Sequence, residues 1–344
     1  MATPLKICHD RILPQDMYRP RPTLPPLRSR PGVRRAVFEF RKMWVVGSTL
    51  RVHFLEGTAE QKATAQREGL IWTQYANLKL DFSGGPDAEI RIAFDPADGA
   101  WSWVGTDARK IPQDQPTMNL GFLDSGTATH EFGHAIGLGH EHQNPRGGIE
   151  WKESAVIASL KGPPNYWTEE QIRDNVLDKY RFDQIRGTAF DPESVMLYYF
   201  PGSWVKSGVG TKANAVVSAV DKQFIASAEA YPGRGEAPAR PVELKVTASK
   251  ATKAAIGAPG EEDLYQFTVK KEGRHVMRTG GETDTVMKLF GPDSVTDLMA
   301  EDDDGGVGSN ARIVANLRPG VYALQVRHYN KRSGTGAYTI RVST

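Results

Sequence analysis

Residues 130–142 read HEFGHAIGLGHEH and hold four of the chain's eight histidines, at positions 130, 134, 140 and 142. In a helix, residues four apart lie one turn above each other, so the imidazoles of His130 and His134 can point at one metal ion. Gly137 suits the left-handed backbone that ends a helix, which lets the chain turn and bring His140 in as a third ligand. Three neutral imidazoles leave a zinc ion an open position for water. The stretch therefore predicts a catalytic zinc site.

Glu131 directly follows the first of these histidines and projects about 100° away around the same helix. It can therefore lie near the metal without binding it, as a general base does. Zinc lowers the pKa of a bound water toward about 7, and Glu131 can take that proton and later pass it to a leaving amine. The predicted reaction is hydrolysis of an amide bond.

Histidines on a helix are more often polar surface residues or satisfied core residues, and for any one of these histidines that interpretation is the commoner one. The complete pattern, however, fixes five positions, which makes a chance match improbable. If each letter occurred at a frequency of about 5%, the pattern H-E-x-x-H-x-x-G-x-x-H would arise by chance in a chain this long about once in 10⁴ sequences.

The extended pattern is the signature of metzincin metallopeptidases, which also asks for a methionine turn further along the chain. Residues 194–198 read SVMLY and resemble the S-x-M-x-Y turn of astacin-like metzincins. Glu141, directly after the third histidine, is a further astacin-like feature, and the resemblance covers roughly residues 40–231. It implies that Met196 lies beneath the metal and that the Tyr198 hydroxyl reaches the zinc, which makes Tyr198 a second catalytic candidate.

The resemblance also implies an α+β metzincin fold, with a twisted β-sheet over an active-site helix and the Met-turn in a lower subdomain. Two details depart from the family. Leu138 stands where astacins usually have Phe, and the single cysteine, Cys8, makes the disulfides of animal astacins impossible. His142 falls outside the motif, and we expect it to be solvated or packed behind the ligands, not to bind the metal.

Local patterns place the elements along the chain. Alternating apolar residues predict strands at 50–54, 89–94 and 117–122, and helical patterns cover 58–76, 127–137, the regions near 150–160 and 168–180, and a last stretch that ends at Tyr231. Beyond a Pro/Gly-rich boundary, five short runs separated by turn residues are typical of an all-β sandwich: DLYQFTV, GRHVMRT, TVMKLF, VYALQVRH and GAYTIRV.

Four regions follow from these patterns. Residues 1–35, rich in Pro and Arg, predict an extended tail or propeptide. Residues 36–231 form the peptidase-like domain, 232–240 a linker, and 241–344 the sandwich. The last region resembles the bacterial pre-peptidase C-terminal domain in the stretches TDTVMKLFGP, EDDDGGVGSNARI and LRPGVYALQVRHYN.

Two further sites stay open at this level. Cys8 is either an idle thiol or an inhibitory ligand that fills the open zinc position, and Asp10 or Asp16 could serve a carboxylate version of that inhibition. The acidic loop at Asp302, Asp303 and Asp304 could gather a calcium ion, although such loops are most often solvated turns.

Composition limits the partners. With 43 basic and 41 acidic side chains the net charge is +2, which gives no electrostatic footprint for nucleic acid. No run approaches the roughly 18 apolar residues of a membrane-spanning helix. The opening residues have no apolar core of the kind that a secretory signal needs, so we expect a chain that is either intracellular or presented without its export segment. The resemblance to appended peptidase domains implies secretion. We expect a monomer that acts on proteins or peptides; the alternative is a secreted binding module with an inactive or altered metzincin domain.

Overall fold

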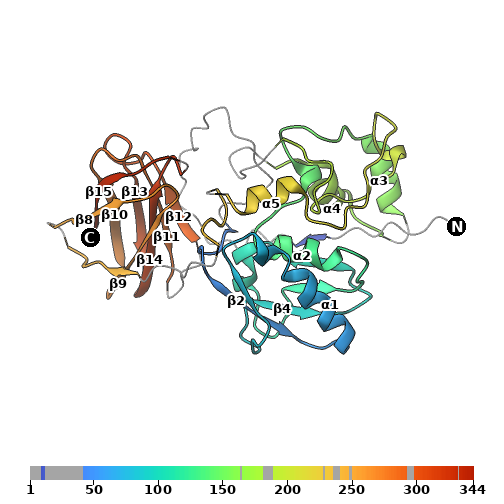
Figure 1. The fold of residues 1–344 in the computed structure, drawn as a ribbon, viewed down its shortest axis with the longest axis horizontal. Coiled ribbons are helices and arrows are strands. Elements are labelled where there is room, and N and C mark those ends of the chain that lie inside the picture. Colours follow the sequence, from blue (N-terminus) through green and yellow to red (C-terminus); the bar gives the residue numbers. More distant parts are fainter. Residues whose placement is uncertain are drawn as a thin grey trace. The chain divides into compact units, whose positions relative to one another are not determined.

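A computed structural model describes residues 9–11, 42–162, 165–180, 189–227, 229–234, 241–247, 250–292, 298–331 and 333–344. Over these residues the chain forms two compact units, one with the described residues up to 234 and one with those from 241 onward. Figure 1 shows helices and a sheet in the first unit and strands in the second. This is the predicted α+β fold followed by an all-β sandwich. Among the described helices, none has the length and apolar character needed to cross a membrane.

The first unit has a six-stranded sheet with the order β1-β5-β6-β4-β2-β3. Only the β5–β6 pair is antiparallel, and the other neighbours are parallel. The strands are β1 (His9–Arg11), β2 (Thr49–Phe54), β3 (Lys79–Asp81), β4 (Ile90–Ala93), β5 (Ala100–Trp103) and β6 (Met118–Leu120). The predicted strands correspond to β2, β4 and β6. Strand β5 was not predicted, because all four of its residues are buried and it lacks the alternation that marks a half-buried strand.

Two helices pack together beside this sheet. Helix α1 (Ala59–Gly69) begins with a capping box in which Thr58 and Gln61 satisfy each other's backbone amides. It is shorter than the predicted helix at 58–76, since the chain continues after Gly69 as a separate 3₁₀ turn (Trp72–Gln74). Helix α2 (Thr127–Ala135) packs against α1, β5 and β6.

Three long side chains hold α2 by its backbone carbonyl groups. The indole of Trp72 donates to the carbonyl of Thr129 (2.7 Å), and the indole of Trp44 donates to that of Ala135 (2.8 Å). The Tyr231 hydroxyl donates to the carbonyl of Ile136 (2.7 Å). The last two carbonyls lie at the C-terminal end of the helix, where no intrahelical donor remains. The bonds from Trp44 and Tyr231 therefore satisfy two carbonyl groups that burial would otherwise leave unpaired.

The part of the first unit that follows α2 has its own apolar core around helices α3 (Glu153–Lys161) and α4 (Glu169–Ile172). Helix α5 (Ala219–Ile225) follows later in the chain. The core side chains of this part include Trp151, Val156, Leu160, Phe200 and Trp204.

Helix α4 is one short turn, so the predicted helix at 168–180 was too long. It passes into a π-helical turn, Arg173–Leu177. The Asn175 side chain donates to the Gln171 carbonyl (2.8 Å), a local bond with which Asn competes against regular helix bonding.

Helix α5 ends at Ile225, whereas the sequence predicted a helix ending at Tyr231. The chain leaves the helix in a turn closed by the Ala230 amide on the Ser227 carbonyl. This turn lets Tyr231 reach α2 and accept a hydrogen bond from the amide of Trp44 (3.1 Å). Tertiary contacts therefore ended the helix early.

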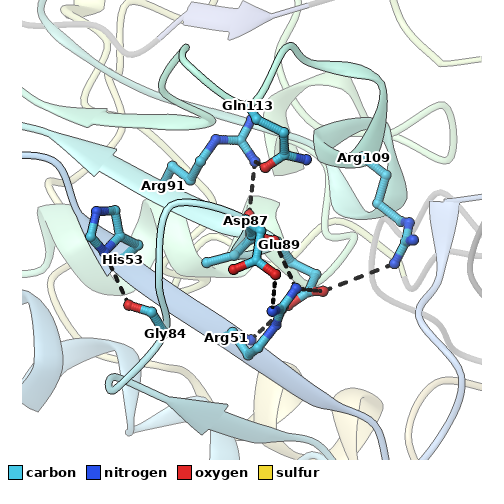
Figure 2. Close-up of polar contacts among 9 residues, drawn as sticks. Arg51, His53, Gly84, Asp87, Glu89, Arg91, Arg109 and Gln113 are labelled. Atoms are coloured by element: carbon cyan, nitrogen blue, oxygen red, sulfur yellow. Dashed lines mark hydrogen bonds and ion pairs between the residues drawn. The ribbon is translucent and has the colours of Figure 1, made fainter.

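Two arginines on neighbouring strands, Arg51 on β2 and Arg91 on β4, make polar contacts with nearby loops, and Figure 2 shows those of Arg51. Arg91 on β4 is buried and donates to the carbonyls of Ala88 (2.8 Å), Ile111 (3.2 Å), Pro112 (3.0 Å) and Gln115 (2.8 Å). It thus holds the loop that leads into β6. Arg51 on β2 instead pairs with the carboxylates of Asp87 (2.6 Å) and Glu89 (3.0 Å).

The second unit is a sandwich of two sheets. One has the order β13-β10-β15-β8 and the other β12-β11-β14-β9-β7, and all pairs are antiparallel except β7–β9. The strands are β7 (Val242–Glu243), β8 (Thr252–Ile256), β9 (Glu262–Val269), β10 (Gly273–Gly280), β11 (Thr285–Phe290), β12 (Leu298–Asp302), β13 (Arg312–Leu317), β14 (Gly320–His328) and β15 (Gly336–Ser343). The five predicted runs are β9, β10, β11, β14 and β15.

A hydrogen-bonded chain joins the two sheets through their interior. The hydroxyls of Tyr265 on β9 and Tyr338 on β15 are 2.6 Å apart, and Tyr338 donates to Asp263 (2.6 Å). Burial raises the pKa of Tyr265 to about 12, so this phenol stays protonated and can donate at neutral pH.

Candidate active site

The three histidines of the motif meet at the C-terminal part of α2. His130 and His134 lie one turn apart on the helix, and positive-φ Gly137 (φ 105°) turns the chain so that His140 returns beside them. The Nε2 atom of His134 is 3.1 Å from that of His130 and 3.0 Å from that of His140. All three side chains are buried.

Hydrogen bonds fix which nitrogen carries the proton in two of the rings. His130 Nδ1 lies 2.7 Å from the Val195 carbonyl oxygen, and His134 Nδ1 lies 2.8 Å from that of Leu138. Because a carbonyl oxygen can only accept, both Nδ1 atoms donate, and in the neutral rings both Nε2 atoms present lone pairs.

This donor set fits a metal ion. Lone pairs that face each other at about 3 Å repel unless a cation lies between them. Imidazoles that bind zinc tetrahedrally at about 2.0–2.1 Å have their nitrogens roughly 3.3 Å apart, close to the spacing seen here. Zinc also favours imidazole ligands whose other nitrogen donates to a carbonyl group, as two of these do.

Tyr198 lies against the same cluster from the Met-turn. Its hydroxyl is within hydrogen-bond distance of His140 Nε2 and 3.2 Å from His130 Nε2. The preceding Met196 is buried, and its sulfur would lie 2.5 Å from a Cβ added at Gly133 of α2. The turn therefore packs directly against the histidine helix.

Glu131 is buried on α2 between the two helical histidines. His142 is buried as well, so of its two predicted placements, solvated or packed behind the ligands, the second is the one that agrees with its burial. Its Nε2 donates to the Asn175 carbonyl (2.9 Å), and its ring lies 5.0 Å from that of His140 between centroids. It is not one of the three clustered histidines but packs against one of them, His140.

Three buried carboxylates surround the Met-turn, and sequence reasoning missed the role of two of them. Glu141 accepts hydrogen bonds from the Asn144 side chain and the Asp191 amide, both 2.9 Å. Burial raises the pKa of Glu141 to about 8, and the nearby carboxylates Asp221 and Asp191 add to the increase. Asp221 accepts from the Val195 amide (3.0 Å). The signal for Asp221 was present as the cap pattern S-x-x-D that begins α5 at Ser218.

The acidic loop of the second unit shows no comparable convergence. Among the described residues, the three clustered histidines are the one group of metal-binding side chains whose ligand atoms come together. In the loop, one carboxylate oxygen of Asp302 accepts from the amides of Gly305 (2.9 Å) and Arg312 (2.7 Å), so it binds the backbone of its own turn. The calcium prediction is therefore not supported.

Cys8, Asp10 and Asp16 bear on the predicted inhibition. Cys8 and Asp16 lie outside the described residues, and Asp10 is described only as part of strand β1.

The first unit is similar in sequence to known proteins. The family model for Astacin, a peptidase family, matches residues 41–211. A solved structure of myroilysin is 34% identical, with a TM-score of 0.54, and the match covers 56% of this chain and 97% of that chain. The metallopeptidase AprA of Pseudomonas marginalis is 26% identical over 154 residues, or 37% of this chain, and the chain spans only 32% of AprA.

The second unit has its own match. It is the pre-peptidase C-terminal domain of a collagenase from Bacillus anthracis, with 19% identity and a TM-score of 0.28, over 31% of this chain and 99% of that domain. The family assignment depends on the first unit, where the family model includes both the histidine motif and the Met-turn and the alignment spans nearly all of myroilysin. The chain belongs to the astacin family of metallopeptidases.

Proposed function

We propose that the chain is a zinc-dependent endopeptidase in which His130, His134 and His140 hold the metal and Glu131 is the general base. The observation that carries the proposal is the convergence of three buried imidazoles, two of which present lone pairs through Nε2. When bound, zinc would polarise the scissile carbonyl group and lower the pKa of a bound water to about 7.

The protein's own groups then have separate tasks. Glu131, next to a ligand on α2, accepts the proton of the attacking water and delivers it to the leaving amine. Tyr198 has its hydroxyl beside the Nε2 atoms of His140 and His130, where it would be a further, displaceable ligand when the metal is bound. When substrate enters, the hydroxyl would move away and donate to the oxyanion that develops on the attacked carbonyl group.

A secreted binding module with an inactive metzincin domain is the alternative function. An inactive relative would often lack the base or a ligand, whereas Glu131, the three histidines, Met196 and Tyr198 are all present in the sequence. Activity of the full chain is therefore the better supported proposal.

The deciding experiment compares the parent with Glu131→Gln. We expect the variant to keep about one zinc per chain, because the three imidazoles are unchanged, and to lose about 10²–10⁴-fold in kcat, because the proton acceptor is gone. Zinc is measured by elemental analysis and turnover by digestion of a denatured protein, with and without a chelator. Glu60→Gln, at an exposed position on α1, is the matched control. Cleavage by Glu131→Gln at the parent rate would contradict the mechanism.

We also propose that the N-terminal segment is a propeptide that restrains this site. Strand β1 pairs in parallel with β5, which packs against α2. An extended peptide substrate can add to the edge of a sheet by backbone hydrogen bonds, so β1 would occupy an edge that a substrate could use. Cys8, the residue just before β1, would then supply the inhibitory thiolate.

We further propose that the enzyme is secreted and that its second unit assists the first. The resemblance of residues 241–344 to pre-peptidase C-terminal domains supports secretion and a role of the sandwich in export, maturation or attachment to substrate. Analysis of culture supernatant and cells for the full chain tests secretion, and retention in the cells would contradict it.

A further inference from the structure

Asp221 on α5 is a buried carboxylate whose two oxygens both serve the Met-turn. Its Oδ1 accepts from the Ser194 hydroxyl (2.8 Å), and its Oδ2 accepts from the Val195 amide (3.0 Å). The same Oδ2 accepts from the amide of Ser218 (3.0 Å), whose side chain caps α5. Asp221 is 26 residues from Val195 in the sequence, and it thus anchors the turn to helix α5.

The hydrogen bonds of the turn continue from Asp221 to a metal ligand. The Ser194 hydroxyl, which donates to Asp221, also accepts from the amide of Met196 (3.1 Å). That amide belongs to the same peptide group as the Val195 carbonyl, which accepts from His130 Nδ1 (2.7 Å). Imidazole, peptide group, hydroxyl and carboxylate therefore form one chain in which every donor points toward Asp221.

Such a chain acts on the imidazole at its far end. Hydrogen bonds in series polarise one another, and a carboxylate at the accepting end increases the electron density on each acceptor before it. A histidine that binds a metal commonly donates its other N–H to a carboxylate or a carbonyl group, which fixes the orientation of the ring and raises its basicity. His130 has a carbonyl as its direct partner, and the carboxylate stands two hydrogen bonds further along.

We propose that Asp221 is a positioning residue for the metal ligand His130 and acts through Ser194 and the Val195–Met196 peptide group. Its role is to hold the Val195 carbonyl in place and to strengthen it as an acceptor, so that His130 keeps the tautomer that presents Nε2 to the metal. The proposal depends on the metal site and not on peptidase activity, so it can be tested even if the chain proves to be inactive.

Asp191 provides a matched control. It is a buried carboxylate in the same network, where it accepts from the hydroxyl of Ser218 (2.7 Å) and the amide of Glu193 (3.1 Å). Neither of these side-chain bonds is part of the chain that leads to His130, and the bond from the Ser194 amide goes to the backbone carbonyl of Asp191. The substitution Asp191→Asn therefore removes a similar buried charge while leaving the proposed connection intact.

The test measures the zinc dissociation constant of the full chain by competition with a chromophoric chelator. Loss of an outer partner of a zinc ligand typically weakens zinc about 10- to 100-fold, and we expect this for Asp221→Asn, with a change below about threefold for Asp191→Asn. Ser194→Ala, which removes only the connecting hydroxyl, should weaken zinc similarly. The double variant should bind zinc about as tightly as either single variant, because both interrupt one chain.

Unfolding of the metal-free proteins in urea identifies a general loss of folding. If Asp221→Asn fails to fold, Ser194→Ala alone decides the proposal. Equal weakening by Asp191→Asn and Asp221→Asn would overturn it, since the effect would then be one of buried charge. A zinc dissociation constant that stays within about twofold of the parent in both Asp221→Asn and Ser194→Ala would also overturn it.

Discussion

Two neighbouring tyrosines of the Met-turn have different surroundings, which bears on their function. The commoner fate of such a pair in an apolar run is that both are core aromatics. Tyr199 is 49% exposed and does not meet that expectation. Tyr198 has its hydroxyl against two of the clustered histidines and its ring 4.6 Å from that of His140. One residue of the pair thus faces the site, and the other faces solvent.

Tyr198→Phe and Tyr199→Phe test this difference directly. A donor used only in the transition state lowers the barrier without aiding ground-state binding, so Tyr198→Phe should lose about 10²–10³-fold in kcat with KM near the parent value. Tyr199→Phe should change kcat little. Steady-state kinetics and zinc content of both variants provide the measurement. If Tyr198→Phe keeps the parent kcat, its hydroxyl is no oxyanion donor.

At the scale of elements, the packing of α2 on the Met-turn sets a steric limit at Gly133. A methyl group there would lie 2.5 Å from the Met196 sulfur and 3.1 Å from the ring of Trp72, and both neighbours are buried. Substitution of a helical Gly by Ala normally stabilises by about 1 kcal/mol, whereas overpacking a core costs about 1–3 kcal/mol. The free-energy cost of this close contact should therefore exceed the gain from the better helix propensity of Ala.

We expect Gly133→Ala to lower the free energy of unfolding in spite of its better helix propensity. Urea titration of the metal-free protein measures this quantity. Gly273→Ala in the second unit is the control, since a Cβ there meets nothing within 4 Å and should change stability by less than about 0.5 kcal/mol. A Gly133→Ala variant more stable than the parent would show that Met196 moves aside without cost.

The elements that the sequence predicted are those whose local pattern agrees with their tertiary role. The alternation in β2 follows its buried positions, Leu50 and Val52, and α2 ends just before positive-φ Gly137, as its sequence predicts. Some failures occurred where tertiary contacts override the local pattern, as in uniformly buried β5. At Asn175 a local side-chain bond ends the regular helix instead. For the site, spacing alone placed the histidines, but the carboxylate of Asp221 comes from a distant helix and no local motif links it to His130.

At the scale of the whole molecule, the described residues form two units with separate cores. The core of the second unit consists of residues between Leu244 and Val342 only, which agrees with its independent strand pattern in the sequence. The pairing of β1 with β5 could not be predicted in this way. Its three residues, His-Asp-Arg, have no apolar alternation, and pairing at a sheet edge depends on backbone groups that every sequence carries.

Because β1 pairs with β5, the N-terminal segment can be tested for a role in the regulation of the full chain. The chain has one cysteine, so a thiol reagent reports on Cys8 alone. If its thiolate binds zinc, Cys8 should react slowly in the metal-loaded protein and faster once a chelator has removed the metal, because coordination occupies the nucleophilic sulfur. Asp16→Asn and Asp10→Asn should leave this behaviour unchanged.

Activity should follow the same logic in two steps. Cys8→Ala removes the thiolate and should raise the initial rate of peptide hydrolysis, chiefly in kcat, because the open metal position becomes available to water. Removal of residues 1–35 also removes β1 from the edge of β5, so it should raise the rate further and lower KM. Initial rates of parent, Cys8→Ala and truncated proteins, each verified by mass, provide the measurement. An inhibitory ligand or a competing strand cannot be removed without an effect on turnover. Equal rates in all three proteins, with Cys8 equally reactive before and after chelation, would therefore show that Cys8 is an idle thiol and that β1 is only a structural strand.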